Sequence, residues 1–248
     1  MAAKGLGSAL RPVCYEAGMS ASFDPQQQAE FDQYAGSYES MHASSVAASG
    51  ESPEYFAVYK QKVLERMLGA GFARPVLDFG CGIGNLTTHL VKSFPDVHGF
   101  DPSAECVKLA AERSPGAKLH SDAAALPKGH FGAAILANVL HHVPPAERTA
   151  LMDTVAATLA PGGKLIIFEH NPLNPVTRHA VAICPFDENA VLLYPTEVKR
   201  LLRGAKLAPV SLEYIVFFPH ALRFARGMEP GLSWVPLGAQ VCAWGVRA

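Results

Sequence analysis

Three glycines alternate along residues 80–84, and their spacing suits the binding of a nucleotide-like ligand. Gly80, Gly82 and Gly84 follow the short apolar run 76–79 and precede an apolar helical pattern. Because glycine adopts positive φ and has no Cβ, such a turn lets backbone N–H groups approach a ligand at the start of a helix. A ligand carboxylate or phosphate would fit there. A tight strand-to-helix turn without a ligand is the alternative at this point.

An acid at the end of the next strand-like run strengthens the ligand interpretation. Asp101 follows the apolar segment 97–100 and comes nineteen residues after Gly82. Nucleotide-binding α/β folds place a carboxylate near this position, where it accepts hydrogen bonds from the ribose hydroxyls. Asp101 also precedes Pro102 and Ser103, so a helix-capping role is the alternative.

His170 is the candidate for proton chemistry. It follows a strand-like run and precedes Asn171 and Pro172, so it lies where a strand gives way to a loop. Histidine titrates near pH 6.5, which leaves a neutral imidazole available as a general base at physiological pH. We expect His170 to act as the base, or as the orienting group, for an acceptor hydroxyl. The alternative is a hydrogen bond within the loop.

These residues need strands and helices to position them. We expect strands at 76–79 and 97–101, and the final two strands at 209–218 and 238–246. Ser52, Pro53 and an early acid provide a helix start, after which apolar residues recur at helical spacing as far as Met67. This helix should pack on the sheet, and 195–202 should form another.

The chain resembles the class I S-adenosylmethionine-dependent methyltransferases over roughly residues 30–248. The resemblance rests on the glycine motif 78–84, the segment 131–143 and the segment 159–169, which occur in the family's order. A dehydrogenase would instead carry Gly-x-Gly-x-x-Gly, and here the third glycine comes one residue early. The resemblance implies a Rossmann-like, doubly wound α/β sheet of seven strands, mostly parallel with an antiparallel C-terminal strand, and with helices on both faces.

The resemblance also implies a cofactor, S-adenosylmethionine, with S-adenosylhomocysteine as its product. In the family, the acid after the second strand holds the ribose, the acid after the third strand faces the adenine amine, and the segment after the fourth strand lines the methionine end. The cofactor-binding residues expected on this basis are Tyr38, Asp78, Gly80, Cys81, Gly82, Asn85, Asp101, Pro102, Asp122, Ala123, Asn138 and Val139.

The sequence predicts one catalytic domain. We expect a flexible tail at residues 1–22 and a single methyltransferase domain at 23–248. Within it, residues 23–70 should form an N-terminal helical cap that closes over the cofactor, with Tyr38 in the entry segment. Residues 171–194 should form a substrate-side insertion.

Composition limits the partners. The formal charge is −1 among 248 residues, which provides no basic field for nucleic-acid phosphates. No apolar segment approaches the length that spans a bilayer, and five scattered cysteines indicate a reduced, cytoplasmic setting. The histidines show no metal-binding spacing, so no metal is expected. Oligomeric state is left open.

The function that these observations favour is methyl transfer to an oxygen, or a carbon, of a small-molecule or lipid-like acceptor. Alignment of the acceptor with the activated methyl group would supply most of the rate. Two alternatives stay open at this point: a nicotinamide-dependent oxidoreductase, and a non-catalytic protein that binds an adenosyl ligand.

Overall fold

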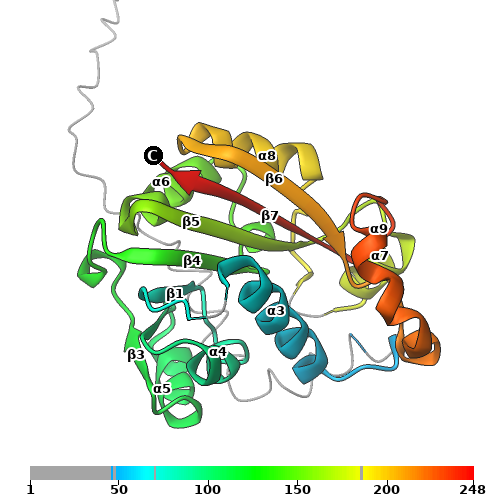
Figure 1. Cartoon of the computed structure of the whole chain (residues 1–248), viewed down its shortest axis with the longest axis horizontal. Helices are drawn as coiled ribbons and strands as arrows, with labels where there is room; N and C mark the ends of the chain where they lie inside the picture. Colours follow the sequence, from blue (N-terminus) through cyan, green and yellow to red (C-terminus); the bar gives the residue numbers. More distant parts are fainter. Residues whose placement is uncertain (1–45, 47–48, 70, 185–186) are drawn as a thin grey trace, which may run out of the picture.

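The computed structural model describes residues 46, 49–69, 71–184 and 187–248, and Tyr38 and the expected tail at 1–22 lie outside them. A seven-stranded sheet runs through the molecule in the order β3-β2-β1-β4-β5-β7-β6 (Figure 1). The strands are β1 (Val76–Phe79), β2 (Val97–Phe100), β3 (Ala117–His120), β4 (Phe131–Ala137), β5 (Leu159–His170), β6 (Leu207–Ile215) and β7 (Gln240–Arg247). Only β7 is antiparallel to its neighbours, β5 and β6, as expected of the C-terminal strand.

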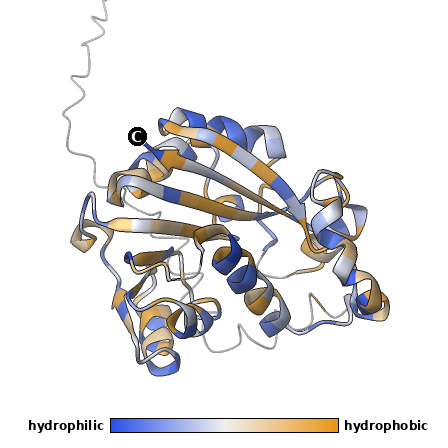
Figure 2. Cartoon of the chain, viewed as in Figure 1, coloured by the Kyte–Doolittle hydropathy of each residue, from blue (hydrophilic) through white to orange (hydrophobic). Residues whose placement is uncertain are grey.

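Helices cover both faces of the sheet. They are α3 (Pro53–Leu68), α4 (Thr87–Ser93), α5 (Ala104–Arg113), α6 (Arg148–Thr158), α7 (Pro175–Ala182), α8 (Pro195–Gly204) and α9 (Glu229–Leu232), with 3-10 turns η2 (Ala123–Ala125), η3 (Leu140–His142) and η5 (His220–Met228). One core cluster joins the sheet to α6 and α8, and a second joins it to α3 and α4. Figure 2 shows apolar residues concentrated in the central strands. Within the described ranges, no helix is both long and apolar enough to cross a bilayer.

The helix expected from residue 53 is confirmed as α3. Ser52 is its N-cap and accepts a hydrogen bond from the Tyr55 N–H, while proline occupies the first turn. Val63 and Leu64 are buried against the sheet, so the expected packing is also confirmed. The helix α3 is thereby held in a fixed position against this face of the sheet.

The two C-terminal strands differ from expectation at their ends. β6 begins at Leu207 rather than residue 209 and ends at Ile215 rather than residue 218. It ends there because Val216 has φ +62°, outside the extended region. Within the expected insertion, α7 begins at Pro175, where Asn174 caps the helix by accepting hydrogen bonds from the N–H groups of Val176 and Thr177. Pro175 therefore starts a helix within this segment.

Arg148 joins three segments behind the sheet. Its side chain is buried, and its guanidinium donates to the Val143 carbonyl at 3.0 Å, the Val191 carbonyl at 2.6 Å and the Glu197 carboxylate at 2.9 Å. The start of α6 is thus tied to the segment before it and to the segment that leads into α8.

Replacing Arg148 with Met should lower the free energy of unfolding by about 3 kcal/mol, because hydrogen bonds from charged groups typically contribute roughly 1.5–3 kcal/mol each. Urea denaturation followed by circular dichroism measures this change. Arg203→Met, on the exposed side of α8, is the control and should change stability by no more than about 0.5 kcal/mol. Equal losses in the two variants would contradict the role assigned to Arg148.

Candidate active site

A cavity of about 490 Å³ lies at the carboxyl ends of β1, β2, β4 and β5. Residues from α3, α7 and the segment after β6 complete its wall. Ligands in open α/β sheets bind at this edge, and the volume is within the usual range for small-molecule sites. Of the predicted residues, Asp78, Gly80, Cys81, Gly82, Asn85, Asp101, Pro102, Asn138, Val139 and His170 all line this cavity.

The glycine turn presents open backbone to the cavity. Gly80 has φ +80°, and a Cβ there would lie 2.6 Å from Cγ2 of Val139. Gly82 has φ +51°, and a Cβ there would meet nothing within 4 Å. The first glycine is therefore required by packing, whereas the second leaves space beside the backbone that a ligand can use.

Asp101 holds this turn in place. Its Oδ2 accepts a hydrogen bond from the Gly82 N–H at 2.8 Å, and its Oδ1 accepts one from the Ser103 N–H at 3.0 Å. Ser103 is the N-cap of α5, so the capping role considered for Asp101 belongs to its neighbour. The carboxylate joins the end of β2 to the turn after β1.

Among the described residues that line the cavity, four buried oxygen atoms have no hydrogen-bond partner: Tyr55 Oη, Asp78 Oδ1, Asn138 Oδ1 and Gln240 Oε1. Asp78 accepts a hydrogen bond from the Thr87 hydroxyl with Oδ2, but its Oδ1 is unpaired. Burial raises the pKa of Asp78 to about 6, against the opposing effect of the Thr87 hydrogen bond. Asn138 has φ +59°, and its buried Oδ1 is also unpaired. Such unpaired oxygens, and a strained backbone beside them, are typical of sites where a ligand supplies the missing donors.

Lys60 is a buried cation that sequence reasoning did not find. It lies on α3 with only 6% of its surface exposed, and burial lowers its pKa to about 8. The negative charges of Glu169 and Asp78 oppose that shift. In the sequence it is one of two lysines on this helix, and nothing in its position distinguishes it from the exposed Lys62.

A buried ion-pair network lies behind the cavity. His141 Nδ1 is 2.6 Å from Glu169 Oε2, and its Nε2 is 3.4 Å from Asp187 Oδ1. Burial alone would lower the pKa of His141, but the two carboxylates outweigh burial and raise it to about 9. Burial would likewise raise the pKa of Glu169 and of Asp187, but the His141 charge holds both below their usual range. His141 is therefore an imidazolium between two carboxylates.

Two further histidines next to this network are neutral. His142 and His170 line the cavity, and the ring of His170 lies 5.1 Å from that of His141. Burial, assisted by the His141 charge, lowers the pKa of His142 to about 3 and that of His170 to about 4. Of these two histidines, only His170 was predicted to take part in proton chemistry. The ion-pair network of His141, Glu169 and Asp187 was not predicted. It forms because the three side chains are buried together and because Asp187 comes from a loop distant in the sequence, and no local pattern in the sequence indicates either.

Some predicted residues lie elsewhere. Asp122 and Ala123 do not line the cavity; Asp122 instead caps η2 by accepting a hydrogen bond from the Ala124 N–H. Tyr38 is outside the described residues.

His141, His142 and Asp187 are close enough together to hold a metal ion. However, both ring nitrogens of His141 already face carboxylates, so ion pairing accounts for this group.

Comparison with known proteins identifies the family. Residues 50–211 match a family model described as a methyltransferase domain. The chain is also 30% identical over 184 residues to a trans-aconitate 2-methyltransferase of Mycobacterium ulcerans (strain Agy99), and the alignment covers 68% of this chain and 67% of that protein. The chain belongs to the class I S-adenosylmethionine-dependent methyltransferases. This methyltransferase is equally 30% identical over 186 residues to the trans-aconitate 2-methyltransferase of Mycobacterium marinum, with the same coverage of 68% and 67%.

Solved structures share the methyltransferase fold. One is a possible histamine N-methyltransferase from Thermotoga maritima, with a TM-score of 0.65 and 16% identity, covering 90% of this chain and 100% of that one. Another is magnesium protoporphyrin IX methyltransferase from Synechocystis PCC 6803 with bound S-adenosylhomocysteine, with a TM-score of 0.58, 16% identity and the same coverage of 90% and 100%. The family assignment excludes the first alternative, a nicotinamide-dependent oxidoreductase. It also shows that the chain is an enzyme, which excludes the second alternative, a non-catalytic protein that binds an adenosyl ligand.

Replacing Glu169 with Gln should lower the pKa of His141, because one of the two flanking negative charges is removed. Since the folded pKa of about 9 lies above the unfolded value near 6.5, His141 stabilises the methyltransferase fully below pH 6.5 and loses this contribution as pH rises through about 9. Histidine NMR titration and urea unfolding at several pH values measure both effects.

Glu188→Gln, at an exposed acid beside Asp187, is the matched control and should leave the His141 titration unchanged. An identical His141 titration in wild type and Glu169→Gln would contradict the network.

Proposed function

We propose that the cavity binds S-adenosylmethionine through the glycine turn 80–84 and the predicted acids Asp101 and Asp122. We further propose that the enzyme methylates a hydroxyl oxygen of an uncharged, largely apolar small molecule. The observation that carries the cofactor part is the open turn at Gly82 held by the Asp101 carboxylate. Asp101 would accept hydrogen bonds from the ribose. The N–H groups of Gly80, Cys81 and Gly82 already donate to the Phe100 carbonyl and to Asp101, so the turn would accommodate the cofactor through the open space at Gly82.

The methionine end would be held by two of the unpaired oxygens. Asp78 Oδ1 and Asn138 Oδ1 both lie at the cavity, and an ammonium group supplies the donors that they lack. Asp122, which is outside the lining, stays a predicted contact of the adenine amine. The cofactor, when bound, supplies an activated methyl group; the residues of this chain bind it, align the acceptor and exclude water.

The charge of the cavity supports an uncharged acceptor. Among the described residues that line it, Lys60 is the only ammonium or guanidinium group, and it already faces the charges of Asp78 and Glu169. The neutral imidazoles of His142 and His170 offer no charge to a carboxylate. The cavity therefore differs from what a triacid such as trans-aconitate requires, although two relatives carry that name.

The acceptor end would lie between α7 and the segment after β6. Val176 and Ala180 of α7 and Phe217 and Phe218 beyond β6 line the cavity there, which supports the substrate-side role proposed for residues 171–194. His170, at the end of β5, would accept the hydrogen bond of the acceptor hydroxyl. The N-terminal cap at 23–70 stays a proposal. Within its described residues, 46 and 49–69, the helix α3 contributes Phe56, Ala57 and Lys60 to the wall.

Gly82→Ala should weaken S-adenosylmethionine binding by about 10- to 100-fold, because a methyl group would enter the space reserved for the ligand, at a cost of roughly 1–3 kcal/mol. Isothermal titration calorimetry measures the affinity. Gly129→Ala is a matched control: its φ is +64°, a Cβ there would also meet nothing within 4 Å, and it is outside the cavity. If both variants bound the cofactor with wild-type affinity, the cradle assignment would be wrong.

His170→Phe should lower kcat by about 10²-fold or more while cofactor affinity stays intact, because the ring nitrogen that receives the acceptor proton is lost. A panel of phenolic, quinol and sugar hydroxyl acceptors, with S-adenosylhomocysteine formation as readout, measures turnover. Since the pKa of His170 is about 4, wild-type turnover should show no inflection from this residue between pH 6 and 9.

His179→Gln, on the exposed part of α7, is the control for this experiment. Unchanged turnover in His170→Phe, or a larger loss in His142→Phe, would remove His170 from the proposed role.

A further inference from the structure

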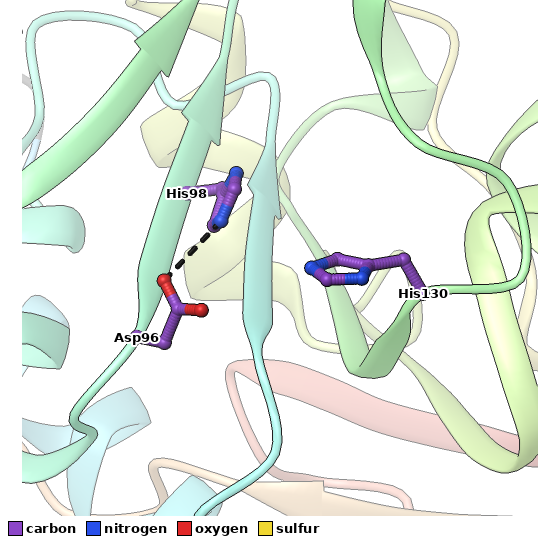
Figure 3. Close-up of side chains that lie close together, drawn as sticks. All are labelled: Asp96, His98 and His130. Atoms are coloured by element: carbon purple, nitrogen blue, oxygen red, sulfur yellow. Dashed lines mark ion pairs between the residues drawn. The ribbon is translucent and has the colours of Figure 1, made fainter.

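A second group of histidines lies at the opposite edge of the sheet from the cavity. His98 is the second residue of β2, Asp96 immediately precedes that strand, and His130 immediately precedes β4. Figure 3 shows the imidazole of His130 directed toward the pair formed by Asp96 and His98. One ligand atom from each of the three residues lies within 4.8 Å of the others, and none of the three lines the cavity.

The nitrogen of His98 that faces this group is buried and lacks a hydrogen bond. Only 6% of His98 is exposed, and its Nε2 has no hydrogen-bond partner, although it is 3.3 Å from Asp96 Oδ1. Its other nitrogen, Nδ1, is 3.1 Å from Nε2 of His120. If Nδ1 donates that bond, the Nε2 lone pair faces a carboxylate oxygen, and a cation between the two would satisfy both.

We propose that Asp96, His98 and His130 bind a single Zn²⁺ ion, with His120 orienting the His98 ring. Two imidazoles and a carboxylate are donors that suit Zn²⁺, and metal-bound histidines usually engage a second partner through their other nitrogen. Three protein ligands leave the fourth position of a tetrahedral ion for water.

The residues can close onto an ion without disturbing the core. Tetrahedral coordination at 2.0–2.1 Å brings ligand atoms to about 3.3 Å from one another, so the group must contract slightly. Asp96 and His130 lie toward the surface and can provide this movement, whereas His98 is fixed. Lys118 competes for the site, because its ammonium is 2.8 Å from Asp96 Oδ1, but its side chain is 63% exposed and free to turn away.

Zinc binding would join the start of β2 to the loop before β4 across β1, which lies between those strands. Because zinc would bind the folded chain and not the unfolded chain, it should raise the free energy of unfolding. We assign the ion no part in methyl transfer.

The test uses the full chain, treated with a chelator and without a histidine tag, titrated with zinc chloride by calorimetry and followed by thermal unfolding. The wild type should bind one zinc ion and its Tm should rise. His130→Gln and Asp96→Asn should each weaken binding at least about tenfold. His179→Gln should not change it, and Lys118→Ala should tighten it by removing the competing ammonium.

Because His130 is exposed, His130→Gln should keep the wild-type Tm in the absence of zinc, so that a loss of binding is not a loss of folding. The proposal is wrong if the wild type binds no zinc. It is equally wrong if binding persists unchanged in both His130→Gln and Asp96→Asn, which would place the ion elsewhere, such as at His141, His142 and Asp187.

Discussion

The hydrogen bond from the Gly82 N–H to the Asp101 carboxylate connects the two strands on which the proposed cofactor site is built. β1 and β2 are parallel neighbours, so their carboxyl ends meet at one edge of the sheet. The carboxylate spans from one end to the other and fixes the turn in the form that a ligand needs. A turn that is held by hydrogen bonds of the protein itself loses less ordering entropy when a ligand binds. The carboxyl ends of the strands therefore form the floor of the cavity, and α3, α7 and the segment after β6 form its walls.

A second constraint is the charge placed behind the acceptor end. An imidazolium at His141, enclosed by Glu169 and Asp187, is stabilised in a region where a lone cation would be costly. Burial, assisted by this positive charge, keeps the adjacent His142 and His170 unprotonated. The charge of His141 thus acts on two cavity residues, and one of them, His142, also has its Nε2 3.5 Å from Asp187 Oδ1. Local acid–base behaviour in this enzyme is set by the network as a whole.

The residues at the carboxyl ends of the first two strands could be predicted from the sequence. The spacing of Gly80, Gly82 and Asp101 predicts their meeting, because parallel strands bring their carboxyl ends together. Lys60 and the Glu169–His141–Asp187 network were not predictable, because their properties come from burial and from a loop far away in the chain. Pro175 shows a third limit: proline starts helices as well as ending them, and only the capping by Asn174 decides which.

The antiparallel strand β7 has a consequence for handling the enzyme. Gln240, at its start, borders the cavity, and the strand then runs away from it, so Arg247 is paired with Leu207 at the far edge of the sheet. Any chain attached after Ala248 leaves the domain on the side remote from the cavity (Figure 1). A fusion partner or surface linkage placed there would lie away from the cavity, whereas one placed beside α3 would lie next to the cavity wall.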